Sequence, residues 1–291
     1  MDIQTSVNPK GVILGGQPGS GKSFLQKEIV KEFTEDFIFI STDDLRLYHP
    51  AYLELQQNPE TVQNAANLVH HYASAWTKKL IKHCIENKYN LIIDSTLGGD
   101  IQSVYDTIDM LRSKDFEVHL RVMAVPAIIS KLSIFLRYET QFSEKGFARW
   151  TRMEDHDNRF DKLEKYLLQI RSAYKLNSLK FYERVFDNSI TIGIECVKSL
   201  SENGIKNWTG FGSSREFTFN ILPYLINTIN RIGNIIQKTE RNKLDFETFI
   251  QNDLSFLKDF ESEIRELSSY ITELIYPLSN DSKEIEEFSN S

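Results

Sequence analysis

The sequence has few cysteines, few glycines and prolines, and no excess of positive charge. Its 291 residues include two cysteines, 13 glycines and 7 prolines, which excludes a disulfide-stapled scaffold and a low-complexity chain. The formal net charge of −7 argues against nucleic acid as the main partner. Hydrophobic residues make up 41% of the chain, so we expect a globular protein with one large domain or a domain plus an appendage.

Long apolar runs are also missing. No run approaches the ~18 to 20 residues that a membrane span needs, and residues 1–10 lack the apolar centre of a signal peptide. We therefore predict no membrane partner and a cytoplasmic location. The six histidines show no spacing typical of a metal site.

Short apolar segments alternate with helical patterns through the first two thirds of the chain. Their near-continuous apolar character is typical of parallel strands covered on both faces. The alternation predicts a doubly wound α/β sheet, which binds ligands at the carboxyl ends of its strands. The predicted strands are residues 11–15, 37–41, 91–94 and 118–125, with 181–186 and 190–194 as edge candidates, and the predicted helices include 22–33, 62–86 and 101–113.

The pattern changes after about residue 200. Residues 201–214 are rich in glycine and small polar residues and predict a linker between a first domain, residues 1–200, and a helical segment, residues 215–291. Two apolar stripes with alternating spacings of three and four residues predict an α-helical hairpin over residues 215–276, followed by an acidic tail. The first stripe is Leu222, Leu225, Ile229, Ile232 and Ile236, and the second runs from Leu257 to Leu274.

The most specific motif lies between the first predicted strand and the first predicted helix. Gly16-Gln17-Pro18-Gly19-Ser20-Gly21-Lys22-Ser23 fits G-x-x-x-x-G-K-[ST], the P-loop or Walker A pattern. The glycines allow backbone amides to point at phosphate oxygens, Lys22 reaches the β- and γ-phosphates, and the Ser23 hydroxyl coordinates Mg²⁺. The motif therefore predicts a site for ATP and Mg²⁺ in a P-loop NTPase-type fold. A glycine-rich turn without a ligand is the alternative, which the complete match disfavours.

Carboxylates follow two of the predicted strands. Asp43 comes after the second strand, where it can accept the proton of an attacking hydroxyl. Alternatively, Asp43 and Asp44 cap the next helix, and the spacing does not decide between these roles. Asp94 ends the third strand, where P-loop folds carry a metal-supporting or substrate-binding carboxylate.

Two arginines flank a bend at Gly146. Arg137 lies at the end of a predicted helical stretch, and Arg149 follows the bend. Guanidinium groups suit the dispersed negative charge of a transferring phosphoryl group, so the pair predicts a lid over the phosphates. Surface arginines are the alternative, and Arg152 and Arg159 lie close enough in the sequence to take the same role.

Taken in order, these segments resemble the zeta toxin family, the kinase half of epsilon–zeta type toxin–antitoxin systems. The resemblance covers about residues 8–195 and does not extend to the helical segment. It rests on residues 15–23, 43–50, 89–96, 122–126, 137–140, 148–149 and 156–157.

The resemblance implies a kinase that phosphorylates a hydroxyl of UDP-N-acetylglucosamine with ATP. It assigns the general base to Asp43, phosphate binding to Lys22, and stabilisation of the transferring group to Arg137 and Arg149. It places Asp94, Thr96 and Arg46 against the sugar nucleotide. It also implies a small helical antitoxin that blocks the ATP site in trans, or C-terminal helices that do so in cis, with a stabilising appendage as the simpler alternative.

Three positions depart from the family pattern. Asp94 stands where the family usually has glutamate, Gly98-Gly99 where it tends to have arginine, and Lys78 where an acidic substrate contact is expected. These departures leave the phosphate chemistry intact but leave the acceptor open, with a nucleotide, NAD or an antibiotic as alternatives. An ATP-binding regulatory module is the alternative from another functional class.

Overall fold

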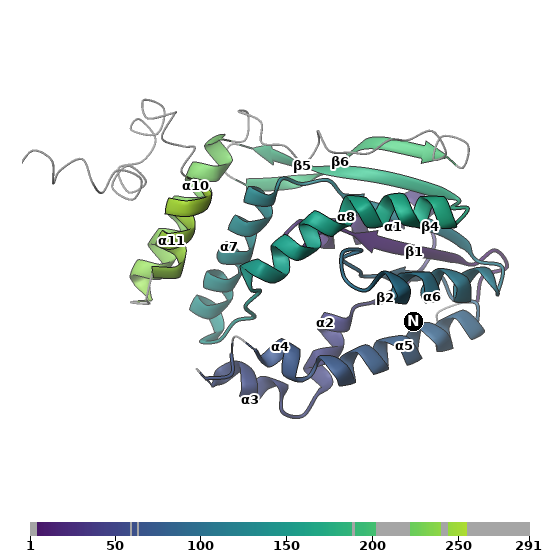
Figure 1. The fold of residues 1–291 in the computed structure, drawn as a ribbon, viewed down its shortest axis with the longest axis horizontal. Helices are drawn as coiled ribbons and strands as arrows, with labels where there is room; N and C mark the ends of the chain where they lie inside the picture. Colours follow the sequence, from purple (N-terminus) through teal and green to yellow (C-terminus); the bar gives the residue numbers. More distant parts are fainter. Residues whose placement is uncertain are drawn as a thin grey trace, which may run out of the picture.

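The computed structural model describes residues 5–58, 60–62, 64–187, 190–201, 222–239 and 244–254. These residues form a six-stranded sheet in the order β2-β3-β1-β4-β5-β6, and Figure 1 shows the fold. The first five strands are parallel, and β6 pairs antiparallel with β5. The strands are β1 Lys10–Gly15, β2 Ile38–Ile40, β3 Leu91–Ile93, β4 Glu117–Met123, β5 Ser178–Asp187 and β6 Ile190–Ser201.

The central strand β1 shows why the strands are apolar along their whole length. Val12 pairs with Ile92 of β3 and with His119 of β4, so β1 has a neighbour on each side. Val12 and Leu14 belong to one hydrophobic cluster, and Ile13 belongs to another on the opposite face. Because successive side chains point to opposite faces, a strand buried on both faces needs apolar residues at every position.

Helices cover both faces of this sheet. One face packs against α1 Ser23–Phe33, α7 Ala127–Lys145, α10 Leu222–Lys238 and α11 Leu244–Asp253. The other face packs against α5 His70–Glu86, α6 Ile101–Arg112 and α8 Met153–Ala173. The predicted doubly wound α/β architecture is therefore confirmed (Figure 1).

A small helical excursion leaves the sheet between β2 and α5. It contains α2 Thr42–Leu45, the 3₁₀ turn η1 Arg46–Tyr48, α3 Tyr52–Gln57 and α4 Ala65–Leu68. The prediction of one continuous helix over residues 62–86 is wrong, because the chain breaks at Val69 into α4 and α5. Val69 is buried against Tyr52 and Ala65, so packing against α3 overrides the local helical preference.

The first C-terminal stripe is buried as the sequence predicts. Leu222, Leu225, Ile229, Ile232 and Ile236 of α10 are at most 3% exposed and share a hydrophobic cluster with β1, α1 and α7. The second stripe, the residues of the predicted linker after Ser201 and the acidic tail lie outside the described residues. The division into domains stays a prediction. Among the described helices, none has the length and apolar character to cross a membrane.

Candidate functional site

The phosphate-loop motif forms a tight turn between β1 and α1. Gly16, Gly19 and Gly21 have φ angles of +139°, +77° and +97°, which residues with a side chain rarely adopt. A Cβ atom on Gly19 would lie 2.1 Å from the carbonyl oxygen of Ser130, in the first turn of α7. The loop therefore curls close to α7, and only glycine fits at its closest point.

Lys22 lies among the charged residues that the sequence singles out. Its Nζ donates to the carbonyl oxygen of Gly16 at 2.9 Å. Burial lowers the pKa of Lys22, and the carboxylates of Asp94 and Asp43 partly offset that effect. The next residue, Ser23, is exposed at the first position of α1.

Asp43 lies in the first turn of α2, directly after β2. Its carboxylate accepts hydrogen bonds from Arg46, at 2.5 Å, and from Arg149. Burial opposes ionisation, but the two guanidinium groups outweigh it and hold the pKa of Asp43 below its ordinary value. No side chain caps the start of α2. The carboxylate of Asp43 therefore pairs with the two arginines and does not cap the helix.

Asp94 follows β3, next to the end of β2. Its backbone amide donates to the carbonyl oxygen of Ile40 at 2.9 Å. Burial raises the pKa of Asp94 despite the opposing charge of Lys22. The site therefore contains two carboxyl groups whose pKa values move in opposite directions, which is how a protein gives two acids different roles.

Thr96 and Arg46 are the other predicted substrate contacts. The carbonyl oxygen of Thr96 accepts a hydrogen bond from the amide of Gly16 at 3.3 Å, so Thr96 adjoins the phosphate loop. Arg46 is 8% exposed, and its Nη2 lies 3.4 Å from Nδ1 of His70. The structure thus brings both residues to the same end of the sheet as Lys22.

The two predicted lid arginines come together at this site. Arg137 donates from Nη2 to the hydroxyl of Thr151 at 3.0 Å, and burial lowers its pKa to about 10. The expectation that Arg137 ends a helix is wrong, because α7 continues to Lys145, and the bend at Gly146, with φ +76°, follows. Packing of α7 against the core keeps Arg137 inside a regular helix.

The competing arginines make different contacts. Arg152 pairs with the carboxylate of Asp155 at 2.8 Å and is 46% exposed. Arg159 donates to the backbone carbonyl of the same residue at 2.8 Å. Because both are held by Asp155, neither occupies the position that Arg149 takes beside Asp43.

Several polar atoms of the site lack partners within the described part of the chain. The Nε atoms of Arg137 and Arg149 and the Oδ1 atom of Asp94 are buried without a hydrogen bond. Buried polar atoms are normally satisfied, so these two donors and one acceptor are suited to a bound polar ligand. The local excess of positive charge favours an anion such as a phosphate.

The structure shows the surroundings of Gly98 and Lys78, two positions that depart from the family pattern. A Cβ atom on Gly98 would lie 2.4 Å from the carbonyl oxygen of Arg159. The backbone of α8 therefore passes so close to Gly98 that an arginine does not fit at this position. Lys78 is exposed on α5.

Sequence reasoning missed residues of β5, α7 and α8 that contact the phosphate loop or its contact residues. Arg184 of β5 donates to carbonyl oxygens of the loop. Gln17 donates from Nε2 to Ser130 Oγ at 3.1 Å, and this hydroxyl lies 2.8 Å from Nε2 of His156. His156 belongs to one of the family-like segments, but nothing in the chain places it beside Gln17.

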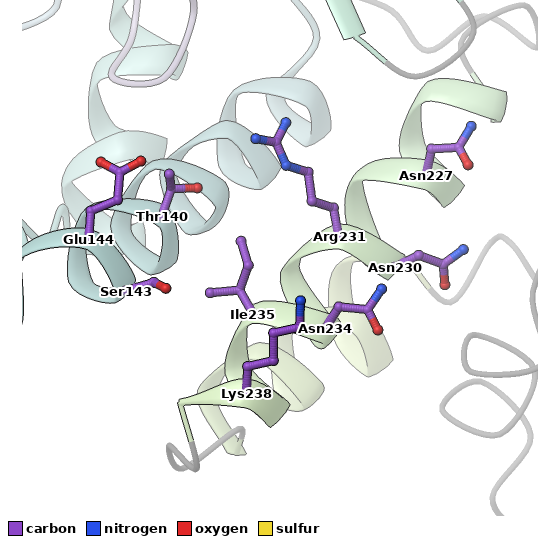
Figure 2. A pocket seen from close by; sticks show the side chains of 9 residues that line it. All are labelled: Thr140, Ser143, Glu144, Asn227, Asn230, Arg231, Asn234, Ile235 and Lys238. Atoms are coloured by element: carbon purple, nitrogen blue, oxygen red, sulfur yellow. The ribbon is translucent and has the colours of Figure 1, made fainter.

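A cavity of about 570 Å³ lies elsewhere, between α7 and α10 (Figure 2). None of its lining residues is a predicted site residue, so we do not place the chemistry there. Nor do the described residues contain a group of three or more His, Cys, Asp or Glu arranged to hold a metal ion. The cavity is lined by Thr140, Ser143, Glu144, Asn227, Asn230, Arg231, Asn234, Ile235 and Lys238.

Known structures share this fold. The PezAT chromosomal toxin–antitoxin system of Streptococcus pneumoniae has a chain that is 23% identical, with a TM-score of 0.66 over 81% of this chain and 90% of that chain. The AvrRxo1-ORF1:-ORF2 structure with ATP is 10% identical, with a TM-score of 0.51 over 79% of this chain and 76% of that chain.

Sequence relatives and a family model agree with the fold. The toxin zeta of Streptococcus agalactiae is 32% identical over 178 residues, which are 61% of each chain. The toxin PezT of Streptococcus pneumoniae is 31% identical over 183 residues, 62% of this chain and 69% of the relative. The matched part of this chain thus spans less than two thirds of the Streptococcus agalactiae toxin. The zeta toxin family model matches residues 2–191, and the chain belongs to that family.

Proposed function

We propose that the protein is a phosphotransferase that moves the γ-phosphate of ATP to a hydroxyl of a small molecule. The observation that carries this proposal is the convergence of four side chains at one end of the sheet. Lys22 of the phosphate loop, Asp43, Arg137 and Arg149 are close enough to shift one another's pKa values. This set combines phosphate binding, a carboxylate base and charge stabilisation.

The phosphate loop fits ATP. Its glycines adopt the positive φ angles that turn backbone amides toward an anion, and α1 begins at Ser23 with its positive end toward the loop. The exposed hydroxyl of Ser23 would hold Mg²⁺, which usually takes few protein ligands and keeps phosphate oxygens and waters. When bound, Mg²⁺ neutralises charge on the β- and γ-phosphates.

In the proposed reaction the acceptor oxygen bonds to the γ-phosphorus while the bond between this phosphorus and the β–γ bridging oxygen breaks. The hydroxyl proton passes to the carboxylate of Asp43, and ADP leaves with the bridging oxygen. Arg137 and Arg149 stabilise the charge on the transferring group. Lys22 exchanges its contact with the Gly16 carbonyl for the phosphates.

Arg149 links nucleotide binding to the base. It pairs with Asp43 and helps to hold the pKa of this carboxylate below its ordinary value, which makes a weak base. A γ-phosphate competes for the same guanidinium. When Arg149 turns to the phosphate, the pKa of Asp43 rises toward the value of a better proton acceptor.

For the acceptor, we propose a sugar nucleotide of the UDP-N-acetylglucosamine type, contacted by Asp94, Thr96 and Arg46. The shorter Asp94, the tightly packed Gly98 and the exposed Lys78 change the acceptor side relative to the family pattern. A nucleotide, NAD or an antibiotic therefore remains the second candidate for the acceptor.

For the partner, we propose a helical antitoxin acting in trans in the cytoplasm. PezAT, whose fold is shared, is a toxin–antitoxin system. Inhibition in cis by the C-terminal helical segment, residues 215–291, is the alternative, and the part of this segment beyond Leu254 lies outside the described residues. The described helices α10 and α11 pack in the core beside α7. This packing supports a stabilising role for these two helices.

The test is transfer of the γ-phosphoryl group of ATP to an added acceptor. Purified protein is incubated with Mg²⁺, γ-³²P-labelled ATP and, separately, UDP-N-acetylglucosamine, NAD, a nucleoside and an aminoglycoside. We expect label to move to UDP-N-acetylglucosamine and not to do so with Lys22→Ala. Label on another acceptor would correct the acceptor, and ATP binding with no labelled product would favour the regulatory module.

A further inference from the structure

Arg184 donates hydrogen bonds from its guanidinium group to the backbone of the phosphate loop. It lies on β5, and its guanidinium reaches the outer side of the loop. Nε donates to the carbonyl oxygen of Ser20 at 3.0 Å, and Nη2 donates to the carbonyl oxygen of Gly19. A Cβ atom on Gly21 would lie 3.1 Å from Nε of Arg184, so the loop and the guanidinium are in direct contact.

The hydrogen bonds from Arg184 supply donors for the backbone carbonyls of the phosphate loop. Amides that point inward at an anion leave their neighbouring carbonyls pointing outward, and each buried carbonyl requires a donor. A cation bonded to the carbonyl of Gly19 polarises the peptide that carries the amide of Ser20. The bond to the carbonyl of Ser20 does the same for the amide of Gly21, which becomes a better donor toward phosphate. The amide of Ser20 donates to the carbonyl oxygen of Gln17 at 3.2 Å, so its polarisation strengthens a hydrogen bond within the loop.

The guanidinium has only uncharged partners among the described residues. Besides the two loop carbonyls, Nη1 donates to the hydroxyl of Ser133 on α7 at 2.8 Å and to the hydroxyl of Tyr224 on α10 at 3.4 Å. Burying a cation without a carboxylate costs free energy. An anionic phosphate on the inner side of the loop would supply the missing opposite charge.

The contact with Tyr224 connects the loop to a helix beyond the family match, which ends at residue 191. Tyr224 is 5% exposed, and its ring lies 4.3 Å from the ring of Phe186, measured between centroids. Its hydroxyl is therefore fixed by packing in front of Arg184. The position of α10 determines where this hydroxyl acceptor stands.

We infer that Arg184 is a positioning residue for nucleotide binding, which holds the phosphate loop by its outward carbonyls and is itself aligned by Tyr224 of α10. This inference rests on the proposed nucleotide site. It adds a support that neither the loop motif nor the family match assigns. Its effect is on ATP affinity, because the hydrogen-bond partners of Arg184 are the loop carbonyls and the hydroxyls of Ser133 and Tyr224, not the proposed catalytic side chains.

The test compares Arg184→Lys with Arg112→Lys. Arg112 also donates to a backbone carbonyl, that of Lys175 at 2.7 Å, but on the exposed surface. Lysine keeps the charge but lacks the planar fork that serves two carbonyls. We expect ATP affinity, measured by calorimetry with Mg²⁺, to fall about 10- to 100-fold in Arg184→Lys, as for two lost charge-assisted hydrogen bonds. At saturating ATP, kcat should stay within about threefold, and Arg112→Lys should match the wild type.

Tyr224→Phe tests the connection to α10. It removes one long hydrogen bond and keeps the ring, so we expect an affinity loss of about two- to fivefold in the wild type. In the Arg184→Lys background the same change should have no further effect, because coupled residues are non-additive. Full additivity of the two changes would overturn the role of Tyr224.

Hydrogen–deuterium exchange without ATP separates this inference from the proposed function. We expect the amides of residues 16–21 to exchange faster in Arg184→Lys than in Arg112→Lys, with unchanged exchange in α6. Faster loop exchange in a protein that binds no ATP would support the clamp and refute the kinase. Wild-type loop exchange and ATP affinity in Arg184→Lys would overturn the clamp.

Discussion

Replacing Asp43 by asparagine separates its role as a base from its role as a partner of two arginines. Asparagine has the same shape and keeps one carbonyl oxygen, but it cannot take up a proton or neutralise Arg46 and Arg149. We expect turnover to fall roughly 10²- to 10⁴-fold, the usual contribution of a general base. ATP affinity should stay the same or increase, because Arg149 is then free for the γ-phosphate.

The same change should lower stability by an amount that the exposure of the side chains limits. Asp43 is 37% exposed and Arg149 is 29% exposed, so their pair contributes about 1 kcal/mol or less. Arg46 is 9% exposed, and a nearly buried cation left without its partner costs about 1–3 kcal/mol. A combined loss of roughly 1–4 kcal/mol lowers Tm by about 2–7 °C in a chain of this size.

Thermal unfolding and steady-state kinetics check this prediction together. Because the folded pKa of Asp43 is depressed below 3.8, the carboxylate stabilises the fold at neutral pH, and this contribution disappears as pH falls through the folded pKa. The Tm difference between wild type and Asp43→Asn should therefore persist down to about pH 4 and vanish in stronger acid. A non-hydrolysable ATP analogue should raise the Tm of Asp43→Asn more than that of the wild type. Near wild-type turnover, or a variant more stable than the wild type, would refute the reasoning.

Four further substitutions and one control test other parts of the site and fold. Lys22→Ala should abolish transfer and weaken ATP binding measured by calorimetry, because it removes the charge that holds the β- and γ-phosphates; retained turnover would contradict the phosphate-loop assignment. Arg137→Ala and Arg149→Ala should each lower kcat roughly 10³-fold with little change in ATP affinity, whereas Arg152→Ala, which breaks only an exposed pair, should leave kcat unchanged. Ile229→Ala removes a fully buried side chain of α10 and should lower the free energy of unfolding in urea by about 2–5 kcal/mol; wild-type stability would show that α10 is not part of the core.

The sequence predicts best those features whose residues are neighbours in the chain. The phosphate loop, its flanking strand and helix, and the apolar stripe of α10 each lie within a short segment, so local patterns specify them. The prediction of one helix over residues 62–86 fails because Val69 is held by Tyr52, which the pattern of that segment does not contain. Packing between elements decides such breaks.

In the candidate site, too, the sequence predicts residues placed by local patterns and misses contacts between distant segments. Lys22 and Asp43 could be proposed from their places after strands, since the carboxyl ends of parallel strands meet at one edge. Arg46 is only three residues from Asp43, but the pairing of Asp43 with Arg149 depends on how the chain after α7 returns to the start of α2. Arg184 could not be predicted, because its approach to the loop requires β5 to lie beside β4 and α7 to leave room for its side chain.

The central claim is that this chain transfers a phosphoryl group to a small molecule. The most direct measurement is mass spectrometry of a bacterial metabolite extract after incubation with the protein, ATP and Mg²⁺. We expect a metabolite to gain about 80 Da, the mass of one phosphoryl group, with the wild type and with Arg152→Ala but not with Lys22→Ala or Asp43→Asn. An extract in which no metabolite gains this mass, or in which Asp43→Asn forms the product as fast as the wild type, would contradict the account.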